Sequence, residues 1–255
     1  HRDDWRVPLT LGRYYFIADE SAKAIPHLIK AKDARPDIPY LWVLTGINYL
    51  QLDSLDVAKA NFEAAIQKFP DDPEINYYLG NVFARKREYH NAIKYFEKSN
   101  EKDPDNIQTL LALAGAYDEN RQYSVSENIY KKLLEKNPGV PIILNNYAYH
   151  LSVRGTRLEE ALQMSQFALE ADPDNAPYLD TMGWIYYQLG DYENAKIYTE
   201  KSLAVQSDSP EVLEHLGDIF AKMGDRENAE KYWRKSLEID KHRTHILEKL
   251  GSNTP

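Results

Sequence analysis

Histidine is the residue type in this chain that most readily binds a metal or moves a proton, and its seven copies are scattered. Two of them, His242 and His245, lie one helical turn apart, and with Asp240 they could supply three metal ligands. A metal site also needs groups that orient its ligands, and none is evident here, so we expect solvated histidines instead. Glycine-rich phosphate loops, dinucleotide-binding glycine patterns and the His-Glu-x-x-His zinc motif are absent from the sequence. We therefore predict no metal and no cofactor.

Carboxylates are numerous, with 40 Asp and Glu residues, and paired carboxylates are what glycoside hydrolysis needs. The runs Glu159-Glu160 and Glu101 to Asp105 stand at expected helix starts or turns, where solvation and the helix dipole explain them. The Asp-rich turns lack the glycine and the distal Glu of a calcium-binding loop. A glycosidase of the α/α-toroid type is the enzymatic alternative, but the repeat described next accounts for every strongly patterned position. We predict that the protein is not an enzyme.

The elements that must position any site follow a period of 34 residues. In each unit, apolar residues at intervals of three and four give one face to each of two helices, with a polar break between them. Units begin near residues 5, 39, 73, 107, 141, 176 and 210, with one residue inserted in the fifth. One helix pair cannot bury both its faces, so the pairs must stack. The set Gly80, Phe83, Ala92, Phe96 and Pro104 is repeated 34 residues earlier as Gly46, Tyr49, Ala58, Phe62 and Pro70.

This pattern resembles the tetratricopeptide repeat (TPR) family over residues 5–243. The resemblance implies an all-α fold, a right-handed α-solenoid (superhelix) of seven helix–turn–helix repeats in a single array. The repeats are expected at 5–38, 39–72, 73–106, 107–140, 141–175, 176–209 and 210–243. Residues 244–255 restart the pattern at Leu250-Gly251 and then stop, which predicts a truncated cap helix and a tail. The sixth unit departs from the pattern because Thr199 replaces the second-helix aromatic.

The resemblance also implies a concave groove that is lined by the first helices and binds partner proteins. A stripe beside the core stripe, again at intervals of three and four, points into this groove. Tyrosine and tryptophan give large contact areas at low entropy cost, and asparagine offers a donor and an acceptor to an extended peptide. The competing interpretation is that Trp184 and Tyr187 pack against neighbouring helices. We predict that a peptide is bound by Tyr77, Asn81, Arg85, Asn145, Asn146, Tyr149, Asp180, Trp184 and Tyr187.

An apolar zone of the groove is predicted at Val43, Ile47 and Leu50. These residues could form a floor for an amphipathic helix, or they could be core between repeats. The function we predict is a protein–protein interaction scaffold that binds a partner peptide or helix. The alternative is a structural protein that self-assembles into a homo-oligomer through the first repeat and this apolar zone.

Charge at the groove positions narrows the choice of ligand. The two-carboxylate clamp of TPR co-chaperones does not fit, because Ala112 and Gly115 stand where polar groups would be needed. The acidic residues Asp180, Glu214 and Asp218 instead favour a ligand that carries Lys or Arg.

Composition excludes other partners. A net charge of −9 and a pI near 5.3 argue against nucleic acid, and no apolar run approaches the ~20 residues of a transmembrane segment. The absence of cysteine leaves the compartment open. Because the chain begins His1-Arg2 without a leader, we expect a processed chain or a fragment. The stretch 157–240 resembles bacterial multi-repeat TPR proteins, many of them exported or lipid-anchored, which favours bacterial origin and a cell-envelope or periplasmic location over a cytoplasmic one.

Overall fold

Paired α-helices build the protein. The computed structural model describes residues 4–251, which contain fifteen α-helices and no strand. The first helices of the pairs are α1 (Arg6–Ile17), α3 (Pro39–Gln51), α5 (Pro73–Arg85), α7 (Ile107–Glu119), α9 (Pro141–Val153), α11 (Ala176–Leu189) and α13 (Pro210–Lys222). The second helices are α2 (Ser21–Ala34), α4 (Leu55–Lys68), α6 (Tyr89–Lys102), α8 (Tyr123–Lys136), α10 (Leu158–Ala171), α12 (Tyr192–Val205) and α14 (Arg226–Ile239). A short helix, α15 (Ile246–Gly251), follows, and the predicted all-α fold of helix–turn–helix repeats is confirmed.

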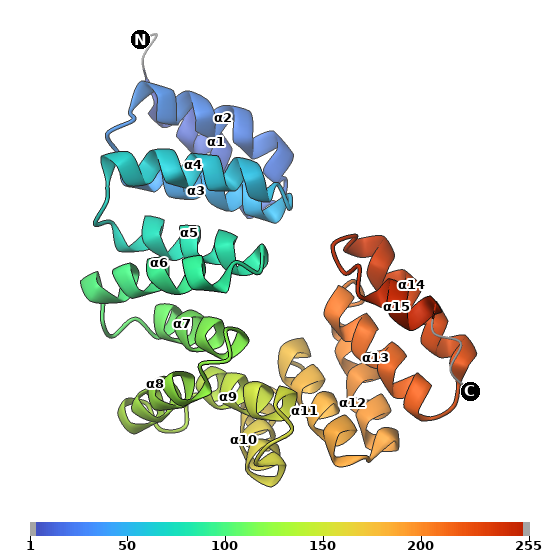
Figure 1. Ribbon diagram of the computed structural model, residues 1–255. Coiled ribbons are helices and arrows are strands. Elements are labelled where there is room, and N and C mark those ends of the chain that lie inside the picture. Colours follow the sequence, from blue (N-terminus) through green and yellow to red (C-terminus); the bar gives the residue numbers. More distant parts are fainter. Residues whose placement is uncertain (1–3, 252–255) are drawn as a thin grey trace. The chain divides into compact units, whose positions relative to one another are not determined.

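The chain forms two compact units, His1–Leu133 and Leu134–Pro255, which we call unit 1 and unit 2. Within each unit neighbouring helix pairs stack, as Figure 1 shows for α3 to α6 in unit 1 and for α11 to α14 in unit 2. A single right-handed superhelix of all seven repeats stays a prediction. The predicted tail at 252–255 lies outside the described residues.

The turns between pairs determine where each first helix begins. Proline stands in the first two positions of α3, α5, α9, α11 and α13, where its missing N–H removes no helical bond. In the Asp-Pro-Asp-Asn turns, the asparagine is the cap: Asn106 Oδ1 accepts the backbone N–H of Thr109 at 3.0 Å. The Asn106 amide donates to Asp103 at 2.9 Å, so the aspartate orients the cap. Asn175 and Asp172 repeat this arrangement ahead of α11.

A glycine-to-ring contact holds the two helices of a pair together. A Cβ atom added to Gly80 would lie 2.6 Å from Phe96 Cδ1, so the ring of the second helix fills the space that the glycine leaves. Gly46 packs in the same way on Phe62. In both pairs the glycine of the first helix lies against an aromatic ring of the second helix. Each ring then lies in the core, where it excludes water from both helices.

The sixth repeat is built differently at this position. Gly183 lies against Thr199, whose hydroxyl is buried and has no hydrogen-bond partner among the described residues. The fifth repeat also has a small residue there, Ser165, and its hydroxyl is likewise buried and unpaired within the described range. Unit 2 therefore carries less aromatic volume between the helices of these two repeats than the third repeat does in unit 1.

Candidate functional site

Four of the predicted peptide-binding residues line one pocket in unit 2. Asn145, Asn146 and Tyr149 come from α9, Asp180 comes from α11, and the pocket has a volume of about 210 Å³. Glu211 at the start of α13 also lines it. We call this space the groove pocket. It brings two amides, a phenol and two carboxylates together, so it can offer a ligand several hydrogen-bond acceptors.

Asn145 is the residue of the groove pocket whose hydrogen bonding is incomplete. Its side chain is only 4 % exposed, and its Oδ1 atom is buried with no hydrogen-bond partner among residues 4–251. A buried polar atom without a partner costs about 1–3 kcal/mol, so such atoms are rare in folded proteins. A ligand that donates an N–H to Asn145 Oδ1 would remove this cost.

The two carboxylates that line the groove pocket each have a hydrogen-bond partner among residues 4–251. The Tyr149 hydroxyl donates to Glu211 Oε1 at 2.5 Å, which ties α9 to α13. His215 Nδ1 lies 3.0 Å from both oxygens of Asp180, which ties α13 to α11. Burial alone would lower the pKa of His215, but the charge and hydrogen bond of Asp180, with the charges of Glu211 and Asp218, raise it above its ordinary 6.5. His215 therefore holds its proton more strongly than a free histidine does.

Trp184 and Tyr187 do not line the groove pocket but form a ring stack beside it. The Trp184 ring stacks on Tyr187 at a centroid distance of 4.5 Å and on His215 at 4.2 Å. Burial, with the charges of Asp218 and Tyr192, raises the pKa of the Tyr187 hydroxyl to about 12. These contacts favour the packing interpretation for both rings. Trp184 Nε1 is buried without an acceptor among the described residues.

Glu214 and Asp218 are neutralised by the chain itself. Glu214 accepts bonds from Arg243 at 2.6 Å, from Lys249 at 2.6 Å and from His245 at 2.9 Å. Asp218 accepts from Lys249 at 2.7 Å. The expectation that these two carboxylates attract a basic ligand is wrong, because residues 243–249 already supply the cations. The expectation that His245 is simply solvated is wrong for the same reason.

The three predicted peptide-binding residues of unit 1 lie in different surroundings. Tyr77 is half-buried and lines a small pocket of about 140 Å³. Asn81 Nδ2 donates to the carbonyl of Tyr77 within its own helix. Arg85 donates to the carbonyl of Leu50 at 2.7 Å and to Asp53 at 2.8 Å, and so joins α5 to the end of α3.

The apolar zone of unit 1 lies in or against the core. Val43 is buried among the residues around Phe62, and Ile47 and Leu50 are half-buried and pack against the same cluster. Of the two interpretations that the sequence left open, this burial favours core packing between repeats for Val43.

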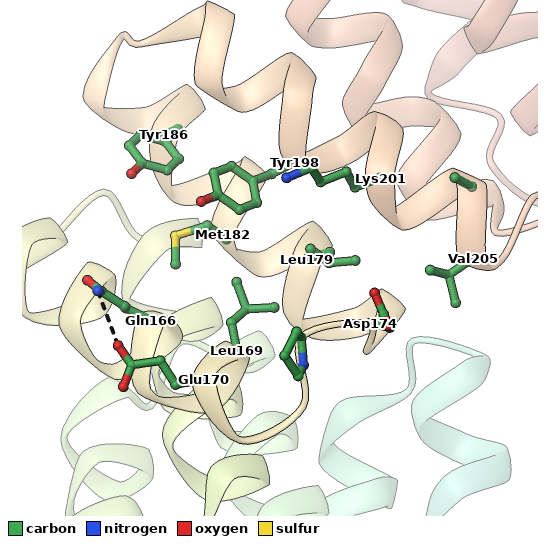
Figure 2. A pocket seen from close by; sticks show the side chains of 12 residues that line it. Gln166, Leu169, Glu170, Asp174, Leu179, Met182, Tyr186, Tyr198, Lys201 and Val205 are labelled. Atoms are coloured by element: carbon green, nitrogen blue, oxygen red, sulfur yellow. Dashed lines mark hydrogen bonds between the residues drawn. The ribbon is translucent and has the colours of Figure 1, made fainter.

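A larger pocket in unit 2 was not foreseen from the sequence. It lies between α10 and α12, with α11 as its floor, and its volume is about 740 Å³. Figure 2 shows Leu179 and Met182 of α11 at its centre. These two residues carry the core stripe of the repeat, so their spacing gave no sign that part of the stripe faces a pocket.

Two further properties of residues 4–251 bear on function. No three His, Asp or Glu side chains in this range are grouped as ligands of a metal ion would be. No helix in the same range has both the length and the apolar character required to span a bilayer.

Stacked antiparallel helix pairs of near-constant length define a helical-repeat scaffold. Sequence models of the tetratricopeptide repeat match residues 43–107, 83–145, 176–209 and 210–243. The chain belongs to the tetratricopeptide repeat family. Repeats of this family generally serve as non-enzymatic scaffolds for protein–protein interaction. No curated protein matches the sequence.

Solved structures share the fold at low sequence identity. A tetratricopeptide repeat protein from Parabacteroides merdae matches with a TM-score of 0.78 and 15 % identity over 97 % of both chains. The APC/C hetero-tetramer Cut9–Hcn1 matches with a TM-score of 0.70 and 16 % identity, over 92 % of this chain and 47 % of that one. The human IFIT1 dimer with m7Gppp-AAAA also has a TM-score of 0.70 and 16 % identity, over 92 % of this chain and 61 % of that one. At this identity the likeness establishes the fold alone.

Proposed function

We propose that the protein is an interaction scaffold whose groove pocket captures an extended, basic peptide segment of a partner protein. The observation that carries this proposal is the set of polar side chains from α9, α11 and α13 that line the groove pocket, among them Asn145 with its unpartnered Oδ1 atom. An extended peptide presents free backbone N–H groups, and one of them would supply the missing hydrogen bond. Beyond the first turn of a helical segment, the N–H groups are used internally.

Charge supports a Lys or Arg in this peptide. Asp180 and Glu211 line the groove pocket, and their present partners, His215 and Tyr149, leave each carboxylate with further lone pairs. Unit 2 also carries 20 Asp and Glu against 13 Lys and Arg, so its net charge of −7 accounts for most of the −9 of the whole chain. This field attracts a basic segment and opposes a phosphate chain such as the one in the IFIT1 complex.

Selection from a library of random 12-residue peptides displayed on phage tests the proposal. We expect the peptides that bind unit 2 to share a Lys or Arg. They should bind the Asn146→Lys variant about tenfold more weakly, because the new ammonium group competes for Asp180 and Glu211. Ile142→Lys is the matched control, since it adds the same charge to an exposed site on α9 that does not line the pocket. Selected peptides that bind the Asn146→Lys variant as tightly as the parent would show that the groove pocket is not their site.

Self-association is a second candidate function, and one observation in unit 1 favours it. Val7, Leu11, Tyr14 and Ile17 recur at intervals of three and four on α1, and they are between 41 % and 78 % exposed. A contiguous apolar stripe of this kind is unusual on a surface that stays in water. A second copy of the chain could cover it, which light scattering over a range of protein concentrations would detect.

A further inference from the structure

The pocket between α10 and α12, which we call the α10–α12 trough, is larger than the groove pocket. Its floor is apolar and consists of Leu179 and Met182 from α11 with Leu169 from α10. Its volume of about 740 Å³ is within the range of sites that bind drug-sized ligands, and it can hold several side chains. In Figure 2 the side chains of α10 lie along one side of this floor and those of α12 along the other.

The trough is a separate site from the groove pocket. The α11 residues that line the trough are Leu179, Met182 and Tyr186, which recur at intervals of three and four on one face of the helix. The α11 residues that line the groove pocket include Asp180 and Thr181, which lie on the opposite face. The two pockets have no lining residue in common.

The chemistry of the trough selects a helix over an extended chain. All three of its walls are helices, whose backbone N–H and C=O groups are already paired internally. An extended peptide laid over the apolar floor would bury its own backbone groups without partners, and that is costly. A helix pairs its own backbone groups and presents apolar side chains at intervals of three and four to a trough of this kind.

The charges at the rim define which helix fits. Glu170 on α10 and Asp174 in the following turn line one side, next to the C-terminal end of α10, where the helix dipole adds negative charge. On the other side, the Lys201 ammonium lies over the Tyr198 ring at 5.2 Å from its centroid. The Glu170 carboxylate accepts from the Gln166 amide at 3.3 Å and keeps further lone pairs. The rim therefore carries two carboxylates and one ammonium group, and the two carboxylates lie together on the α10 side.

We propose that the α10–α12 trough binds an amphipathic helix of a partner protein, with its apolar stripe on the floor and a Lys or Arg against Glu170 and Asp174. This second site goes beyond the groove pocket and differs from it in ligand form, since one takes an extended segment and the other a helix. A partner with both kinds of segment would be held on two faces of unit 2.

Methionine methyl resonances provide a direct test, because the chain has three methionines and one of them forms the floor. The full chain is labelled with ¹³C at the Met methyl groups and titrated with a designed amphipathic helix of about 18 residues that carries Leu on one face and Lys on its flanks. A second probe has Glu in place of every Lys. We expect the Met182 resonance to shift with the Lys probe while Met223 does not, and the Lys probe to bind about fivefold tighter than the Glu probe.

Variants distinguish the trough from general charge attraction. The double variant Glu170→Gln with Asp174→Asn should remove the preference for the Lys probe. The control double variant, Asp208→Asn with Glu238→Gln, removes two negative charges as well but should keep this preference. Ala204→Trp fills the trough from an exposed position on α12 and should abolish the Met182 shift, whereas Ile197→Trp, on the same helix but outside the trough, should not.

Three results would overturn the proposal: no Met182 shift with either probe, equal binding of both probes, or a Met182 shift that survives Ala204→Trp. A Met182 shift that depends on protein concentration alone would identify a second copy as the occupant and would also overturn it. Loss of groove-pocket binding in Asn146→Lys with an unchanged Met182 titration would separate the two sites.

Discussion

Replacing Glu214 by Gln removes the carboxylate that holds the C-terminal segment on α13. The Glu214 side chain is 9 % exposed and accepts bonds from Arg243, His245 and Lys249. Burial opposes its ionisation, but the hydrogen bonds and charge of Lys249, with the hydrogen bonds of His245 and Arg243, lower its pKa from 4.5 to about 2. This shift corresponds to at most about 3 kcal/mol of differential interaction. Because His245 and Lys249 are 38 % and 29 % exposed, solvent screens part of it, and we expect a loss of about 1–2 kcal/mol at pH 7.

The pH dependence of this loss follows from the direction of the shift. The folded carboxyl has a lower pKa than the unfolded one, so its stabilisation is complete above about pH 5 and is lost as the pH falls from 4.5 towards 2. Urea unfolding of the parent and of Glu214→Gln should therefore differ by about 1–2 kcal/mol at pH 7, and by half of that or less at pH 3. Amide exchange in residues 246–251 should be faster in the variant at pH 7.

The exposed Glu248 on α15 provides the matched control, since Glu248→Gln removes the same charge from the same segment. The reasoning is refuted if Glu214→Gln and Glu248→Gln unfold with equal free energies at pH 7. It is also refuted if the difference between Glu214→Gln and the parent is as large at pH 3 as at pH 7.

Three further changes test other parts of the structure. Gly80→Ala should lower the free energy of unfolding, measured in urea, by about 1–3 kcal/mol, because the alanine methyl group would overlap the Phe96 ring. Gly251→Ala is the control and should show no such loss, since no atom of the described residues crowds that position. Burial, with a smaller effect of Arg154, lowers the pKa of His150 to about 4, so NMR should show this histidine titrating near that value. The stability that its neutral form contributes should be lost as the pH falls from 6.5 towards 4. Titration near 6.5 would contradict its burial. If α1 mediates self-association, Tyr14→Lys with Ile17→Glu should leave the helix content by circular dichroism unchanged and make the light-scattering mass independent of concentration.

The helix pairs could be predicted from the sequence because the signals that define them are local. Small residues, rings and prolines recur every 34 positions, and each acts within its own pair or turn, as Gly80 does with Phe96. Which stripe of a first helix faces the groove depends on packing between repeats, which is not a local signal. Asn145 and Asp180 line a pocket, whereas Val43 lies in the core, although the same interval of three and four describes both the groove stripe and the packing stripe. That the first two residues bind a peptide stays a prediction.

The trough escaped prediction for a related reason. Leucine and methionine are residue types typical of core positions, so Leu179 and Met182 look like core residues in the sequence. In the structure they line the pocket between α10 and α12. The aromatic residues at 186 and 198 stack on each other, as Phe83 and Tyr95 do in unit 1, so their types gave no warning either. The bacterial origin and cell-envelope location expected from the sequence stay predictions.

Two long-range contacts share the same separation in the sequence, which becomes apparent only from the structure. His215 binds Asp180, 35 residues earlier, and Lys249 binds Glu214, also 35 residues earlier. Both pairs join an acidic residue on a first helix to a basic residue one period and one residue later in the sequence. In this contact, α15 packs on α13 as α13 packs on α11. Leu250-Gly251 falls in the same register, 34 residues after Leu216-Gly217. The C-terminal segment therefore binds Glu214 of the seventh repeat in the way that the seventh repeat binds Asp180 of the sixth. The groove pocket differs because its carboxylates are bound by one histidine and one tyrosine, which leaves acceptors for a ligand.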